Sequence, residues 1–199
     1  VEILCFSSAG AGLNLQWTLK IVDQEVILWY VNHSSYSPPT ISSLSNDTSI
    51  SVYGNTTVTI RGDNFGKRGG PWHTFANFGE PPFLEYNTTG CVVIIDHTMM
   101  QCRTTALLVG RKRTKLEWRL NVANQPGITS TTASTSFAAP YITDLEGHIN
   151  MQTRGGEVVR LKGFNFGPVT SSFVSAVYGQ AGGTQFNATK CNVTKANVE

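Results

Sequence analysis

The residues of this chain that could do chemistry are few, and the cysteines come first. There are four: Cys5, Cys91, Cys102 and Cys191. Thiols can pair as disulfides, stay free or bind zinc. Ten residues separate Cys91 from Cys102, and the apolar run Val92-Val93-Ile94-Ile95 lies between them. A zinc site is not expected because no histidine lies at ligand spacing from either, so a disulfide and two buried free thiols remain open.

Six asparagines stand in the Asn-x-Ser/Thr acceptor sequence for N-glycosylation: Asn32, Asn46, Asn55, Asn87, Asn187 and Asn192. These are six of fourteen asparagines, in a chain in which about a fifth of all residues are serine or threonine, so the excess over chance is modest. An occupied acceptor lies on the surface of a secreted protein. We therefore expect covalent N-glycans and an extracellular or cell-surface location, reached through the secretory pathway.

The remaining reactive residues form no catalytic pattern. The four histidines share no spacing typical of a metal site or a general base, and the chain has no Ser/His/Asp order, no paired-carboxylate motif and no phosphate loop. We expect no enzyme activity, no cofactor and no metal. The net charge of +2 and the 14% of charged residues argue against a nucleic-acid partner, which requires clustered Lys and Arg. The longest apolar run, residues 26–31, is far short of a membrane span, so no direct membrane insertion is expected here.

The chain repeats itself with a period of 101 residues. Residues 17–66 align with residues 118–167 without a gap, and fourteen of the fifty positions are identical. A period near 100 residues is the length of a domain. We expect a complete middle domain at residues 38–138, flanked by a leading piece (residues 1–37, the C-terminal half of one repeat) and a trailing piece (residues 139–199, the N-terminal half of the next).

The hydrophobic pattern is that of β-strands. Residues 57–61 and 118–122 alternate between apolar and polar side chains, and no stretch has the sustained 3.6-residue period of a helix. Many short strands in units of about 100 residues are typical of antiparallel sandwiches. Pro39 and Pro140 open successive repeats with almost no spare linker, and proline restricts its own backbone and that of the residue before it. We expect an all-β chain of tandem sandwiches held at fixed angles, arranged as a rod, with Trp17 and Trp118 in the cores.

Two short motifs invite a binding role that the repeat argues against. Arg61-Gly62-Asp63 has the form of an integrin-binding tripeptide, but the matching residues of the next repeat are Lys162-Gly163-Phe164. The shared glycine indicates a backbone requirement at the end of a strand. The basic run at residues 111–115 stands where the repeat lengthens, so we expect a solvated loop tip, with contact to an anionic glycan as the alternative.

The openings of the two later repeats resemble a known family. Residues 39–44 and 58–66 (PTISSL and VTIRGDNFG), like residues 140–145 and 155–167, resemble the start of an IPT/TIG domain. The resemblance implies immunoglobulin-like sandwiches, which occur in tandem in plexins, the hepatocyte growth factor receptor family, fibrocystin-like proteins and microbial surface proteins. Extracellular members often carry a cysteine pair around one strand, which implies a disulfide between Cys91 and Cys102. The family spans receptors, enzyme accessory domains and transcription factors, so it indicates fold more than function.

The two flanking pieces fit each other. Cys191 corresponds to Cys91 and Cys5 to Cys102, yet neither has its partner beside it. If residue 199 is joined to residue 1, twelve residues separate Cys191 from Cys5, against ten in the middle domain. We expect a Cys5–Cys191 bond between successive units, either in a continuous polymer of repeated units or between separate chains. A fragment of a larger ectodomain is the remaining possibility.

Together these features predict a structural subunit of a glycosylated extracellular filament or stalk, built of tandem TIG domains and partnered head to tail by copies of itself. The alternative is a ligand-binding or adhesive ectodomain segment of a plexin-like or fibrocystin-like cell-surface receptor.

Overall fold

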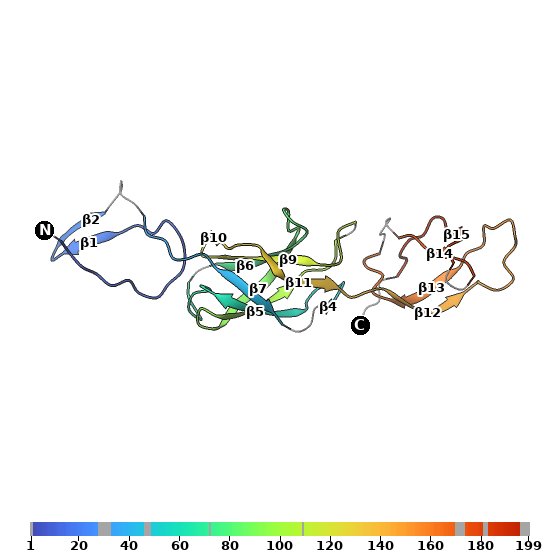
Figure 1. Ribbon diagram of the computed structural model, residues 1–199, viewed down its shortest axis with the longest axis horizontal. Coiled ribbons are helices and arrows are strands. Elements are labelled where there is room, and N and C mark those ends of the chain that lie inside the picture. The colour runs from blue at the N-terminus through green and yellow to red at the C-terminus, as the bar shows by residue number, and fades with distance from the viewer. Residues whose placement is uncertain are drawn as a thin grey trace.

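The computed structural model describes residues 2–27, 33–45, 49–71, 73–108, 110–169, 174–180 and 183–195, and these residues form strands and no helix. In chain order the strands are β1 (Thr18–Ile21), β2 (Gln24–Ile27), β3 (Thr40–Leu44), β4 (Ser49–Ile50), β5 (Thr57–Asp63), β6 (Thr74–Gly79), β7 (Tyr86–Ile95), β8 (Met99–Thr104), β9 (Leu116–Val122), β10 (Gln125–Pro126), β11 (Ser130–Phe137), β12 (Tyr141–Glu146), β13 (Arg160–Phe164), β14 (Val177–Tyr178) and β15 (Phe186–Asn187). In Figure 1 the β1–β2 part and the β12–β15 part lie at opposite ends of the long axis, with β3–β11 between them.

Strands β3 to β11 form a two-layered sandwich. One layer has the order β3-β5-β8-β7 and the other the order β6-β9-β11, with β10 beside β9 and β4 parallel to β11. Strand β7 belongs to both layers, since its first two residues pair with β6 and residues 88–95 run along β8. Four strands facing three in this order is the arrangement of an immunoglobulin-like sandwich. The prediction of an all-β immunoglobulin-like fold is confirmed for this domain.

The core lies where the predicted alternation places it. In β9, Leu116, Trp118, Leu120 and Val122 are buried, and the residues between them are half-buried. In β5, Val58 and Ile60 are buried against the second layer in the same way. Because successive side chains of a strand point to opposite faces, one apolar set per strand is enough to fill the space between the layers.

The trailing piece repeats the first hairpin of the middle domain, pair by pair. Ile41 lies opposite Gly62 in the β3–β5 hairpin, and Ile142 lies opposite Gly163 in the β12–β13 hairpin. Both hairpins have their register shift at the next pair, between Ile41 and Ser43 and between Ile142 and Asp144, 101 residues apart. The residues after them also agree, since Asn64 and Asn165 both adopt a positive φ, 65° and 62°. The 101-residue period of the sequence is therefore also a period of the backbone structure.

The leading piece repeats the end of the middle domain in the same way. Ile21 pairs with Gln24 in the β1–β2 hairpin, and Val122 pairs with Gln125 between β9 and β10. The bridge between Leu15 and Ser34 reproduces the pairing of Leu116 with Thr135. The residues of β13 are mostly exposed, whereas its counterpart β5 contains the buried Val58 and Ile60. No second layer covers β13 among the described residues. The three-part domain division itself stays a prediction.

The glycine of the Arg61-Gly62-Asp63 triplet serves the backbone. A Cβ on Gly62 would lie 1.9 Å from the carbonyl oxygen of Thr40, and one on Gly163 would lie 2.0 Å from that of Tyr141. Both glycines sit at the hairpin irregularity, where the neighbouring strand approaches closely. The flanking Arg61 and Asp63 are exposed at the end of β5.

Gly62→Ala should therefore destabilise the middle domain. We expect the free energy of unfolding to fall by about 2 kcal/mol or more, since the strand β3 must shift to admit the methyl group. Asp63→Ala is the matched control within the triplet and should change it by less than about 0.5 kcal/mol, because Asp63 is exposed. Urea unfolding followed by tryptophan fluorescence measures both. Equal losses in the two variants would contradict a structural role for the glycine.

Candidate functional site

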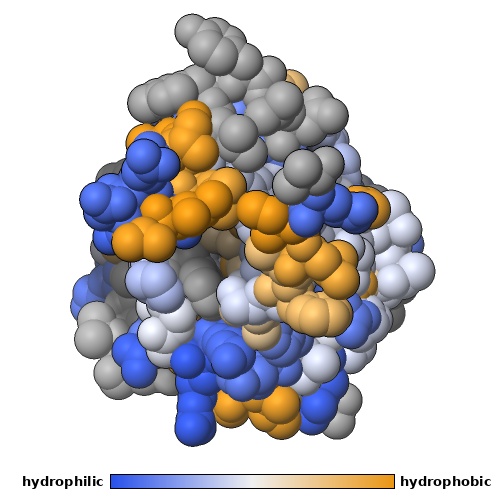
Figure 2. Space-filling view, turned by 90° about the vertical axis from the view of Figure 1, so that its left-hand side faces the viewer, coloured by the Kyte–Doolittle hydropathy of each residue, from blue (hydrophilic) through white to orange (hydrophobic). Residues whose placement is uncertain are grey.

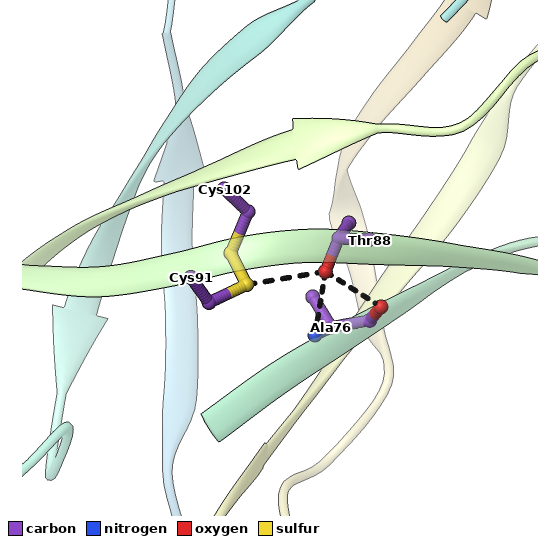
Figure 3. Close-up of a disulfide and its surroundings, with 4 residues drawn as sticks. All are labelled: Ala76, Thr88, Cys91 and Cys102. Carbon is purple, nitrogen blue, oxygen red and sulfur yellow. Dashed lines mark hydrogen bonds between the residues drawn. A yellow bond between two sulfur atoms is a disulfide. The ribbon is translucent and has the colours of Figure 1, made fainter. Parts of the chain in front are cut away.

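A disulfide joins Cys91 in β7 to Cys102 in β8, as the family resemblance implies. Figure 3 shows the Thr88 side chain pointing at the bond. The buried Thr88 hydroxyl accepts a hydrogen bond from Ala76 N (2.9 Å), donates one to Ala76 O (3.0 Å) and lies 3.1 Å from Cys91 Sγ. Ala76 belongs to β6 in the opposite layer. The disulfide and Thr88 together tie the two layers at one point.

Three stacked rings and a fourth that meets them edge-on form the centre of the sandwich, called the central stack below. Phe78 of β6 stacks on Trp118 of β9 at a centroid distance of 4.6 Å and on Tyr86 of β7 at 5.0 Å. Phe137 of β11 meets Tyr86 edge-on at 5.1 Å. All four side chains are buried. Trp118 also donates from Nε1 to Thr135 Oγ1 (3.0 Å), and Tyr86 donates its hydroxyl to Lys112 O (3.2 Å). Burial raises the pKa of Tyr86 to about 12.

The trailing piece carries half of this stack, uncovered. Tyr178 of β14 and Phe186 of β15 stack at a centroid distance of 5.2 Å, in the same register as Phe78 and Tyr86 and 100 residues later. Tyr178 is 50% exposed and Phe186 is 56% exposed, whereas their counterparts in the middle domain are at most 1% exposed. The Tyr178–Phe186 pair is therefore formed, but among the described residues no third ring packs on it.

The leading piece carries the other half. Trp17 donates from Nε1 to Ser34 Oγ (2.6 Å), which is the Trp118–Thr135 hydrogen bond displaced by 101 residues. Trp17 is nevertheless 44% exposed, so the prediction that it lies in a core does not hold within this chain. Tyr36, the counterpart of Phe137, is half-buried and donates its hydroxyl to Ser8 O (2.5 Å). The leading piece therefore has the strand pairing and the tryptophan hydrogen bond of the middle domain. Its described residues include no counterpart of Phe78, the ring on which Trp118 stacks.

Several apolar side chains are exposed, among polar ones, at the end of the molecule formed by the leading piece. Figure 2 shows hydrophobic surface on two sides of a hollow at this end. Side chains of β1 and β2 line a shallow pocket there, including Leu19, Ile21 and Val26, and Ile21 and Val26 are more than half exposed.

The remaining two cysteines are free in this chain. Cys5 is exposed and Cys191 is half-buried. They belong to the parts at opposite ends of the long axis in Figure 1. No disulfide within one copy of the chain connects these two parts, and the predicted bond between successive units stays a prediction.

Four of the six predicted acceptor asparagines lie in described residues, and all four are exposed: Asn55, Asn87, Asn187 and Asn192. Asn32 and Asn46 lie outside the described residues. Asn87 and Asn187 occupy the same register position, opposite Asn77 and Val177. The Gly- and Thr-rich sequence at residues 87–90 is typical of a turn, but Asn87 lies in strand β7. Its side chain points away from the core, since Tyr86 and Thr88 on either side are buried.

The basic run is more than a solvated loop, because Arg113 holds the junction to the trailing piece. Its Nη2 donates to Asn165 O (2.7 Å) and Ala138 O (3.3 Å), and burial lowers the pKa of the guanidinium. Asn165 donates in turn from Nδ2 to Ala139 O (3.1 Å). Lys112 pairs with Glu80 at 3.3 Å. A run of like charges in a sequence gave no sign that one member would meet backbone carbonyls from across a domain boundary.

The junction with the leading piece is built differently. Asn64 donates from Nδ2 to Pro38 O (3.0 Å), the same bond as in the later junction, 101 residues earlier. The position of Arg113 is taken by Gly12, and the cross-junction bond comes instead from Gln125, whose Nε2 donates to Tyr36 O (2.7 Å). Both junctions are therefore held by side chains that bond to linker carbonyls.

Other kinds of site find no support in the part of the chain that the structure describes. No three His, Cys, Asp or Glu side chains there lie close enough together to hold a metal ion. None of its elements is a helix long and apolar enough to cross a membrane.

The comparison with known families agrees with this geometry. Residues 39–137, from the residue before β3 to the end of β11, match the IPT/TIG domain. The chain contains an IPT/TIG domain. Such domains are non-enzymatic immunoglobulin-like sandwiches, typically extracellular or at the cell surface, which agrees with a disulfide that forms in an oxidising compartment. No curated protein matches the chain.

Removing the disulfide should weaken the IPT/TIG domain. Replacing Cys91 and Cys102 by alanine should lower the free energy of unfolding by about 2 to 3 kcal/mol, because the bond restricts the unfolded chain. Wild-type protein in reducing buffer should lose the same amount, and the double variant should be insensitive to reductant. Urea unfolding with and without reductant measures this. A wild-type curve that reductant leaves unchanged would contradict the bond.

Replacing Arg113 should loosen the junction after the IPT/TIG domain. Arg113→Met removes a charged donor from two carbonyls, a loss of about 1.5 to 3 kcal/mol at the junction. Residual dipolar couplings should then report separate alignments for the domain and the trailing piece, where the wild type shows one. Arg111→Met is the matched control, since Arg111 is exposed in the same loop. Loosening in both variants, or in neither, would contradict the role of Arg113.

Proposed function

We propose that this chain is a structural subunit of a glycosylated extracellular filament or stalk, in which immunoglobulin-like IPT/TIG domains follow one another head to tail. Its work is mechanical. Each domain is a disulfide-linked sandwich, and short linkers with hydrogen bonds to side chains transmit force from one domain to the next.

The observation that carries this proposal is that the hairpin that opens the IPT/TIG domain occurs again immediately after the domain ends. Three residues separate β11 from β12, and the β12–β13 hairpin has the register of β3–β5 displaced by 101 residues. A linker this short leaves little freedom between the parts. The hydrogen bonds of Arg113 and Asn165 to its carbonyls reduce that freedom further. Repetition through a stiff joint supports an extended array.

The surface of the chain suits such an array outside the cell. The four described acceptor asparagines are exposed and are distributed over the middle domain and the trailing piece. N-glycans on them would cover strand edges that could otherwise pair with neighbouring molecules. The low charge of the chain leaves no strong electrostatic feature that would select an anionic or cationic ligand.

Electron micrographs of the native material test the proposal. We expect filaments or stalks with an axial repeat of one domain length, and glycopeptides that contain Asn87 and Asn187 from the same preparation. Isolated particles attached to a membrane-spanning receptor chain would contradict a filament and favour the adhesive ectodomain instead.

A further inference from the structure

We propose that the outer face of strands β5, β8 and β7 is a binding site for two N-glycans, those of Asn55 and Asn87, and that Arg103 binds the first sugars of both. The two glycans stand side by side on one face of the middle domain. The site rests on the glycosylation that the proposed function includes, and it does not depend on the filament.

Strand pairing brings Asn55 and Asn87 to the two sides of the end of β8. The backbone N–H of Asn55 donates to Thr104 O (2.7 Å), and Thr105 Oγ1 donates to Asn87 O (2.8 Å). Neighbouring strands lie about 4.8 Å apart, so the two asparagines are separated by roughly 10 Å. Both are exposed. Two glycans attached here therefore share one patch of surface.

The register places Arg103 between the two acceptor sequences. Arg103 pairs with Thr57 of β5 on one side and with Thr89 of β7 on the other. These threonines are the third residues of the acceptor sequences at residues 55–57 and 87–89. All three side chains are exposed, and residues directly opposite each other share one face of a sheet, with Cβ atoms about 5 Å apart. Arg103 thus lies beside both attachment points.

The guanidinium of Arg103 is available for a ligand. It makes no hydrogen bond and no ion pair with any other residue that the structure describes. A guanidinium carries five N–H donors and no acceptor. The hydroxyl and acetamido oxygens of a sugar are acceptors, so the first sugars of a glycan on either side complement it.

Asn77 fixes the orientation of the Asn87 side chain. Its Nδ2 donates to Asn87 Oδ1 (2.5 Å) from β6, which lies on the side of β7 opposite β8. This bond uses the oxygen of the Asn87 carboxamide and leaves its amide nitrogen, the atom that bears the sugar, free. Because the oxygen points toward β6, the sugar leaves on the other side, toward β8 and Arg103.

The surface beyond Arg103 suits sugar rings. The next row of the same face holds Thr59, Gln101 and Val92. Gln101 donates from Nε2 to Thr59 Oγ1 (3.2 Å), and Val92 is 53% exposed. A sugar has polar hydroxyls and an apolar C–H face, so it can form hydrogen bonds and pack on such a row. Glycans that lie here would remove Val92 from water, which is favourable.

The trailing piece has only one acceptor of this pair. Asn187 has the register of Asn87, but Gly156 stands at the position of Asn55. A glycan on Asn187 therefore has no neighbour at that position, which makes it a reference within the same chain.

Release of the glycans from the native, glycosylated protein tests the role of Arg103. The probe is peptide N-glycosidase, and glycopeptide mass spectrometry follows each site. Arg103→Met should speed release at Asn55 and at Asn87 at least about tenfold, because a hydrogen bond to a charged group contributes about that much. Release at Asn187 should stay unchanged. Unchanged rates at Asn55 and Asn87 would overturn the proposal.

Arg61→Met is the matched control. Arg61 is an exposed arginine on the same face of β5, four residues beyond Thr57 and therefore about 13 Å along the strand. It should leave release at every site as in the wild type. Equal acceleration by Arg61→Met and Arg103→Met would show a general effect of charge and overturn the site.

Intact masses and glycopeptides of the secreted protein test the pair. We expect molecules in which Asn55 and Asn87 are both glycosylated. Bare asparagine at either position in all molecules, or molecules that carry one of these glycans but never both, would overturn the shared site.

Thermal unfolding separates sugar binding from a structural role of Arg103. In the glycosylated protein, Arg103→Met should lower the Tm of the middle domain by about 4 °C or more. The chain with Thr57→Ala and Thr89→Ala lacks both acceptor sequences but keeps Asn55, whose positive φ of 59° asparagine tolerates. In that chain Arg103→Met should leave the Tm unchanged. Equal losses in both would assign Arg103 a structural role and overturn its binding of sugars.

The two proposals fail separately. Filaments built from a chain in which Asn55 or Asn87 is bare would remove the two-glycan site and leave the filament. Paired glycans held by Arg103 on a protein whose native form is not filamentous would leave the site and remove the filament.

Discussion

The structure depends on the central stack, whose four rings come from both halves of the domain sequence. Phe78 and Tyr86 lie on β6 and β7, and Trp118 and Phe137 lie on β9 and β11. Because the stack at 4.6 Å and 5.1 Å joins the early strands to the late ones, neither half can bury its own apolar face. The exposed rings of the leading and trailing pieces follow directly from that division.

Backbone geometry is the second constraint, and the β3–β5 and β12–β13 hairpins meet it in the same way. The close approach of the neighbouring strand excludes a Cβ at Gly62 and Gly163, and the positive φ of Asn64 and Asn165 turns the chain so that each side chain reaches a linker carbonyl. The motif that looks like an adhesive triplet is thus explained by the hairpin. Because the opposite strand leaves no room for a Cβ, glycine is required at this position in both hairpins, whatever residues flank it.

The two junctions, before and after the middle domain, are not held by the same set of side chains. Asn64 and Asn165 make equivalent bonds, but Arg113 has glycine at its counterpart position, Gly12, and Gln125 supplies the cross-junction bond there. In both joints the side chains satisfy carbonyls of a linker that has too few residues to fold on its own. These bonds fix the linker carbonyls to side chains of the neighbouring part, so they stiffen and stabilise the joint together.

The sequence by itself determined the strands, the faces of β5 and β9, the repeat length and the family, and with the family the Cys91–Cys102 bond. These follow from local rules, since alternation sets the face of a strand and a steric need for glycine recurs at a fixed spacing. Only the tertiary structure decided the strand order, the role of Arg113 and the difference between Trp118 and Trp17. Both tryptophans make the same local hydrogen bond, but one is buried and the other is 44% exposed. Burial depends on a layer that comes from a distant segment, and no local pattern records whether that segment is present.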